Sequence, residues 1–143
     1  MVIAIANDHG GTELKRYLVE QLRGRVGIQV LDFGVADLQS VDYPAYAQQV
    51  CAALRSGTAE RGILLCGTGL GMSMAANRFP GIRAALCHDE FTARLSRQHN
   101  DANILVLGGR VTGTALAAAI METWLMTPFE EGRHLRRIQM MDV

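Results

Sequence analysis

The chain has 143 residues and no formal net charge at neutral pH, because 14 Lys and Arg residues balance 14 Asp and Glu residues. Hydrophobic residues make up 49% of it, which excludes a disordered chain, and the length predicts a single domain over residues 1–143. The even charge balance argues against a dedicated nucleic-acid binder, which would carry a basic excess.

Membrane insertion and secretion are not expected. No apolar run reaches the roughly 18 residues that a membrane-spanning helix needs, and the first residues do not resemble a signal peptide. The three cysteines, Cys51, Cys66 and Cys87, form no disulfide framework, and the four histidines show no metal-ligand spacing. We therefore expect a cytoplasmic protein without a metal ion.

Short apolar runs alternate with helical patterns along the chain. The runs predicted to be strands buried on both faces are residues 2–6, 29–33, 62–65, 83–87 and 104–107. The apolar stripes that predict helices are Leu14, Tyr17, Leu18 and Leu22, then Ala47, Val50, Cys51 and Leu54, and later Leu116, Ile120 and Trp124. Asp42 is predicted to cap the second of these helices, with Pro44 in its first turn. The alternation predicts an α/β protein with a three-layer Rossmann-like fold, in which a five-stranded parallel sheet is flanked by helices.

A basic C-terminal arm is predicted over about residues 129–143, after the segment from Pro128 to Gly132 ends the last long helix. The arm is expected to pack on its own body or on a neighbouring subunit. Arg133 and Arg137 are four residues apart, so in a helix they would share one face and could grip a phosphate. A solvated basic helix is the alternative.

Cys66 ends the third apolar run and opens a turn with the sequence Gly-Thr-Gly-Leu-Gly, residues 67–71. Free backbone N–H groups at the start of a helix attract anions, so the turn is a candidate phosphate or oxyanion cradle and Cys66 a candidate base or nucleophile. A tight structural turn with a small buried cysteine is one alternative. The other is a dinucleotide fingerprint, with Asp89 as the ribose-binding acid, but the spacing and the position after the third strand fit it poorly. Cys51 and Cys87 are interpreted as packing residues.

Further candidates flank the predicted strands, and ligands of open α/β sheets bind at the C-terminal strand ends. Asp8 and His9 follow the first strand and suit contacts to sugar hydroxyls and phosphate, although helix capping would also explain them. Arg110 follows the fifth strand. His99 and Asn100 form an acid/base candidate that precedes the fifth strand, so they belong on the opposite edge unless a second subunit brings them to the thiol.

Together these segments resemble the type B ribose-5-phosphate isomerase family, which is grouped with the galactose-6-phosphate isomerase subunits. The resemblance extends over almost the whole chain. Its landmarks are Asp8-His9, Val41-Asp42-Tyr43-Pro44, residues 62–73, Asn77, residues 81–85, residues 96–101, Gly109-Arg110-Val111 and residues 131–137.

The resemblance implies how proton transfer is divided among the residues of the turn. Cys66 would be the base, while Thr68 and the amides of Gly67, Gly69 and Gly71 would hold the enediolate. Some family members use a glutamate a few residues further on as base. Residues 72–75 read Met-Ser-Met-Ala, so this chain resembles the cysteine type. The chemistry requires no metal and no organic cofactor.

The sugar-binding residues follow from the same resemblance. His99 would open the furanose ring, and Asp8, His9 and Asn100 would bind the sugar. The family is dimeric or higher, with each active site built from two subunits, so a homodimer or homotetramer is expected. A second subunit would resolve the position of His99.

The resemblance further implies that Arg110, Arg133 and Arg137 help bind the phosphate. The implied activity is aldose–ketose isomerisation between ribose 5-phosphate and ribulose 5-phosphate in the pentose phosphate pathway. Residues 34–40 are this chain's own, so another sugar phosphate, such as allose 6-phosphate or a tetrose phosphate, is an alternative. A non-catalytic sugar-phosphate-binding module is a second alternative, against which the intact pair of Cys66 and His99 argues.

Overall fold

A five-stranded parallel sheet organises the protein, whose computed structural model describes residues 1–142. The strands are β1 (Val2–Asn7), β2 (Gln29–Asp32), β3 (Arg61–Cys66), β4 (Ala84–Leu86) and β5 (Ile104–Gly108). Their order in the sheet is β2-β1-β3-β5-β4, and every neighbouring pair is parallel. The predicted sheet is confirmed, and each strand boundary lies within one residue of its predicted position.

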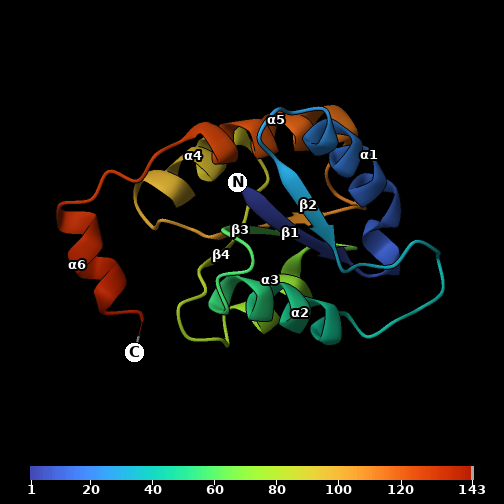
Figure 1. Cartoon of the computed structure of the whole chain (residues 1–143), viewed down its shortest axis with the longest axis horizontal. Coiled ribbons are helices and arrows are strands. Elements are labelled where there is room, and N and C mark those ends of the chain that lie inside the picture. The colour runs from blue at the N-terminus through green and yellow to red at the C-terminus, as the bar shows by residue number, and fades with distance from the viewer. Residues whose placement is uncertain (143) are drawn as a thin grey trace.

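Helices cover both faces of this sheet (Figure 1). Within residues 1–142 the helices are α1 (Thr12–Arg23), α2 (Tyr43–Arg55), α3 (Leu70–Ala76), α4 (Glu90–Gln98), α5 (Thr114–Met126), α6 (Arg133–Gln139) and the 3-10 turn η1 (His9–Gly11). The helices α1, α4 and α5 lie on one face, and α2 and α3 lie on the other. The three layers therefore match the predicted Rossmann-like architecture.

The central strands β1, β3 and β5 are buried on both faces because successive side chains alternate between two cores. Ile3 and Ile5 of β1 pack under α1 and α5, whereas Ala4 and Ala6 face α2. Small alanines let α2 approach the sheet closely. The apolar character of these strands is therefore continuous along the sequence and does not alternate.

The prediction that all five strands are buried on both faces is wrong for β2 and β4. Both are edge strands, and their residues are partly or fully exposed. An apolar run indicates a strand, but its position in the sheet depends on the crossovers. Leu116, Ile120 and Trp124 all lie on α5 as predicted, with Leu116 42% exposed and the other two fully buried.

Residue preferences explain several helix ends. Asp42 occupies the predicted N-cap of α2 with Pro44 in the first turn, but its carboxylate makes no capping hydrogen bond. Asp89, by contrast, caps α4 by accepting a 2.7 Å hydrogen bond from the Thr92 amide, and this bond lowers the pKa of its carboxyl. The carboxylate of Asp89 therefore has a structural partner, and nothing in its surroundings indicates a ribose.

The C-terminal arm leaves the body after α5 and ends in α6, which stands apart from the two helical layers (Figure 1). Arg133 and Arg137 are both exposed on α6, as predicted for a helical arm, while His134 and Ile138 are buried on its other side. Val143, the last residue of the predicted arm, lies outside the described residues. That residues 1–143 form one domain stays a prediction.

Among residues 1–142, no helix has both the length and the apolar character needed to cross a lipid bilayer.

Replacing Gly109 with Ala should reduce the free energy of unfolding by about 1–3 kcal/mol, because overpacking against rigid atoms is destabilising. A Cβ at Gly109 would lie 2.4 Å from the Gly10 carbonyl oxygen and 3.1 Å from the Gly11 Cα, and both are backbone atoms. Urea denaturation measures the loss. Gly24→Ala is the matched control, since its Cβ would meet its nearest neighbours at 3.7 Å. Equal stability of the two variants would contradict the close packing of these loops.

Candidate active site

The C-terminal ends of β1, β3 and β5 bring three predicted site segments to one edge of the sheet. Asp8 follows β1, and its amide donates to the Leu65 carbonyl of β3 at 3.0 Å. The Gly109 amide, after β5, donates to the Cys66 carbonyl at 2.8 Å. The parallel register therefore places Asp8, Cys66 and Arg110 at the same edge, as the sequence predicts.

Glycines allow these three loops to meet backbone against backbone. A Cβ on Gly10 would lie 2.7 Å from the amide nitrogen of Gly67, and one on Gly109 would lie 2.4 Å from the carbonyl oxygen of Gly10. The Arg110 guanidinium covers the same turn, with Nη1 3.3 Å from the position of a Cβ on Gly67. A larger residue at Gly10 or Gly109 would push the loops apart, whereas one at Gly67 would displace the Arg110 side chain.

The sulfur of Cys66 is held by the glycine-rich turn that follows it. Its Sγ accepts a 3.1 Å hydrogen bond from the Gly69 amide, and the side chain is only 5% exposed. Gly69 has a φ of 83°, a left-handed conformation that suits glycine, and α3 begins at the next residue. The buried sulfur therefore faces a backbone N–H at the start of α3.

The residues around this sulfur have defined orientations. Asp8 is buried and accepts from the Gly10 amide at 2.8 Å, which caps the 3-10 turn η1. His9 accepts at Nδ1 from the Val41 amide at 3.4 Å, so a neutral His9 carries its proton on Nε2. The ring of Tyr43 packs against Gly71, 2.7 Å from the position that a Cβ would take there. The sequence singled out Tyr43 only as a landmark of the family resemblance.

Four predicted site residues lie elsewhere. His99 ends α4 and Asn100 follows it, before β5 begins, while Arg133 and Arg137 lie on α6. The strand β5 separates the two edges by about 13 Å at roughly 3.3 Å per residue. One chain therefore carries two groups of site residues and does not bring His99 to Cys66.

Two residues that the sequence did not single out as partners support His99. The ring of His134 stacks on the His99 ring with centroids 4.2 Å apart and planes 7° apart. The Glu130 carboxylate lies 4.0 Å from His99 Nε2 and 3.7 Å from His134 Nε2. The i, i+4 spacing of Glu130 and His134 was visible in the sequence, but only the fold shows that both meet His99.

This cluster does not have the geometry of a metal centre. His99, Glu130 and His134 each place a potential ligand atom within 4.8 Å of the others. A metal ion must lie near the plane of each imidazole that ligates it, because the nitrogen lone pair lies in that plane. Since the two rings are stacked and nearly parallel, an ion in the plane of one lies outside the plane of the other. The arrangement instead fixes the orientation of the His99 ring.

Comparison with known proteins identifies the family. A family model described as Ribose/Galactose Isomerase matches residues 3–141. The chain is 47% identical to ribose-5-phosphate isomerase B of Escherichia coli (strain K12) over 137 residues, which cover 96% of this chain and 91% of that protein. The chain belongs to the Ribose/Galactose Isomerase family. The family resemblance of the sequence is thereby confirmed.

Solved structures of Ribose/Galactose Isomerase relatives share the whole fold. A ribose 5-phosphate isomerase of Thermotoga maritima is 56% identical, with a TM-score of 0.96 over 99% of this chain and 97% of that chain. Ribose-5-phosphate isomerase B of Clostridium thermocellum is 51% identical, with a TM-score of 0.97 over 99% of this chain and 95% of that chain. Nearly the whole length of this chain is therefore covered by the shared fold.

The free energy of unfolding of this Ribose/Galactose Isomerase family member should fall in mild acid because of His134. Burial lowers the pKa of His134, the charges of His99, Arg133 and Arg137 lower it further, and Glu130 partly offsets them. In the unfolded chain the pKa returns to its ordinary value of about 6.5. As the pH falls below that value, the unfolded state binds a proton that the folded state does not, so the free energy of unfolding falls.

The measurement is urea denaturation at about pH 7.5 and pH 5.5 for the wild type and His134→Phe, which keeps an aromatic ring on His99 but cannot titrate. The wild type should lose more stability on acidification than the variant. The same loss in both proteins would show that His134 binds its proton equally well in the folded and unfolded states.

Proposed function

We propose that the protein is an aldose–ketose isomerase that interconverts ribose 5-phosphate and ribulose 5-phosphate in the pentose phosphate pathway. The names of its relatives support this reaction, since they are ribose-5-phosphate isomerases at 47–56% identity over nearly the whole chain. The observation that carries the proposal is the Cys66 sulfur, held by the Gly69 amide at an edge that it shares with Asp8 and Arg110.

Cys66 acts as the base in this proposal. Its thiolate takes the proton from C2 of the open-chain aldose, the electron pair of that C–H bond forms the C1–C2 double bond, and O1 takes the negative charge. The thiol then returns the proton to C1, and the O2 proton passes to O1, so that O2 becomes the ketone oxygen and O1 the C1 hydroxyl. One carbon is oxidised as its neighbour is reduced, so the reaction balances without an external redox partner.

In the turn after Cys66, one hydrogen-bond donor is directed at the base and the others are available to the substrate. The Gly69 amide serves the sulfur, which differs from the role on the enediolate that the family resemblance implied for it. The Thr68 hydroxyl accepts from the Leu70 amide at 3.3 Å, so its own proton is free to donate to a substrate oxygen. Thr68 and the amides of Gly67 and Gly71 then hold the enediolate, and such donors contribute roughly 3–4 kcal/mol each to transition-state stabilisation.

The second group of site residues completes the site from a neighbouring subunit. We propose that His99 opens the furanose ring and that Asn100, with Asp8 and His9 of the first subunit, binds the sugar.

Arg133 and Arg137 of the same neighbouring subunit, with Arg110 of the first, bind the phosphate. Remote binding of this kind positions the reacting carbons against the base. The smallest assembly that allows it is a homodimer, and a homotetramer of such dimers keeps the same sites. The three free cysteines support a reducing, cytoplasmic location.

Replacing Cys66 with Ser should lower kcat by more than about a hundredfold, because a hydroxyl is a far weaker acid than a thiol and cannot hold the charge that proton transfer requires. Phosphate-ester binding should persist, since no phosphate contact is removed. A coupled assay of ribulose 5-phosphate formation measures the effect. Cys51→Ala, at a buried packing cysteine, is the control and should keep its activity. If the serine variant retains more than a tenth of the wild-type kcat, Cys66 is not the base.

Mixing two inactive variants tests whether the site is shared between subunits. Cys66→Ser and His99→Asn should each be severely impaired, and co-refolded mixtures should recover about a quarter of wild-type activity, because half of a random mixture is hybrid and each hybrid has one intact site. Mass spectrometry under native conditions counts the hybrids. Hybrids without any recovered activity would place both residues in one chain's site.

A further inference from the structure

The segment that carries His99 and Asn100 is a tight turn with an unfavourable backbone. Asp101 has a φ of 43°, in the left-handed region that residues other than glycine rarely adopt. The turn is closed by the Asp101 amide on the Arg97 carbonyl at 3.1 Å and by the Ala102 amide on the Ser96 carbonyl at 2.9 Å. A turn of this kind persists only where its surroundings hold it.

The guanidinium of Arg83 supplies much of that support. Its Nε donates to the Asn100 carbonyl at 2.9 Å, and its Nη2 donates to the Asp101 carbonyl at 3.2 Å and to Asp101 Oδ2 at 3.3 Å. Arg97 takes the other carboxylate oxygen, Asp101 Oδ1, at 2.7 Å and also donates to the Ala102 carbonyl at 2.8 Å. Two guanidinium groups, both largely buried, therefore hold the turn from opposite sides.

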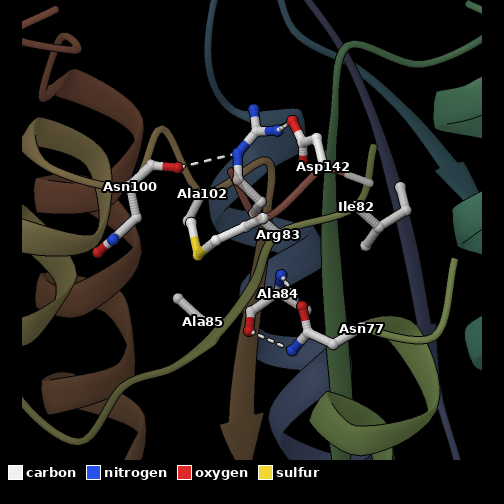
Figure 2. Close-up of a pocket in the computed structure, with 9 residues that line it drawn as sticks. Asn77, Ile82, Arg83, Ala84, Ala85, Asn100, Ala102 and Asp142 are labelled. Carbon is white, nitrogen blue, oxygen red and sulfur yellow. Dashed lines mark hydrogen bonds and ion pairs between the residues drawn. The ribbon is translucent and has the colours of Figure 1, made fainter. Parts of the chain in front are cut away.

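The same guanidinium holds the end of the C-terminal arm. Arg83 Nη1 donates to Asp142 Oδ2 at 2.7 Å, and Figure 2 shows Arg83 between the Asn100 carbonyl and Asp142 at the wall of a pocket of about 330 Å³. The Asp142 amide donates to the Ile138 carbonyl of α6 at 3.0 Å, so Asp142 moves with that helix. Arg83 thus connects the His99–Asn100 turn to α6, which carries Arg133 and Arg137.

The start of the C-terminal arm is also held against the turn that carries His99 and Asn100. The Glu130 amide donates to the Gln98 carbonyl at the end of α4 at 3.1 Å, and His134 stacks on His99. The arm is therefore held against the turn at both of its ends, once by Glu130 and His134 and once by Arg83. Between these two anchors the side chains of Arg133 and Arg137 remain exposed.

We propose that Arg83 is a positioning residue that keeps the ring-opening residue and the phosphate-binding arginines at a fixed separation. The proposal rests on the function proposed above, because it assumes that His99, Asn100, Arg133 and Arg137 act on one sugar phosphate. A substrate fixes the distance between its phosphate and its ring oxygen, so the residues that bind these two groups need a rigid connection. Arg83 touches neither group and acts only through the turn and the arm.

The planar fork of arginine is needed for this task. Its three nitrogens reach Asn100, Asp101 and Asp142 at once, whereas the ammonium of lysine is a single point charge on a flexible stem. Arg83→Lys should therefore lose part of both connections while keeping the charge that balances Asp101 and Asp142.

Three variants separate the two connections. Asp142→Asn weakens only the contact to the arm and should raise KM about two- to fivefold with little change in kcat, because this pair is partly exposed. Asp101→Asn keeps a residue that tolerates the left-handed conformation but removes its charge, and should lower kcat about tenfold with little change in KM. Arg83→Lys should change both.

The experiment measures kcat and KM for ribose 5-phosphate, together with competitive inhibition by inorganic phosphate as a probe of the arm. Inhibition should weaken in Asp142→Asn and Arg83→Lys but not in Asp101→Asn. The double variant Arg83→Lys/Asp142→Asn should raise KM by less than the product of the two single effects, because both changes act on the same contact. Arg94→Lys, at an exposed arginine of α4, is the matched control and should behave as wild type.

Thermal unfolding of each variant shows whether it is folded, and the two Asp variants test the proposal even if Arg83→Lys does not fold. Wild-type kcat, KM and phosphate inhibition in folded Asp101→Asn and Asp142→Asn would overturn the positioning role, while a loss of activity in Cys66→Ser would still support the proposed function. Equal changes of kcat and KM in both Asp variants, in proportion to lost stability, would also overturn it, since they indicate a purely structural effect.

Discussion

All five strands of the sheet run in the same direction, and this constraint decides at which edge of the sheet each predicted site residue lies. Parallel pairing of β1, β3 and β5 gathers their C-terminal ends at one edge, where Asp8, Cys66 and Arg110 meet. The segment that enters β5 must then lie at the other edge, and it carries His99. A single chain consequently carries two separate groups of predicted site residues, one at each edge of the sheet.

The two groups are built by different physical means. At the Cys66 edge, Gly10 and Gly109 let three loops touch through their backbones, the Gly69 amide donates to the buried sulfur, and the Arg110 guanidinium lies over Gly67. At the His99 edge, side chains provide the order. His134 stacks on the catalytic candidate, and Arg83 and Arg97 hold the strained turn at Asp101. Backbone amides can stabilise an oxyanion that forms at a fixed position. A guanidinium has several N–H groups, so it can hold a turn and a separate arm at the same time.

Much of the fold could be predicted from the sequence, since unbroken apolar runs between amphipathic helices indicate strands covered on both faces. The misses concern position within the sheet. Gln29, Asp32 and Arg83 interrupt the two edge runs, whereas the three central runs contain no polar side chain, but the order of the strands itself is decided by the crossovers. The exposure of Leu116 has a related cause, as α5 presents apolar side chains on several sides and only tertiary packing selects those that face the sheet.

The sequence by itself determined the family, the parallel α/β architecture and the glycine-rich turn between Cys66 and the next helix, because residue spacing and glycine content act locally. Only the tertiary structure decided how Gly69 is used, with its amide committed to sulfur. Tertiary structure also brought together residues far apart in sequence: Glu130 and His134 with His99, and Arg83 with both Asp101 and Asp142. Such contacts depend on where a strand, a turn and a distant arm meet in space, and local sequence patterns do not encode these long-range distances.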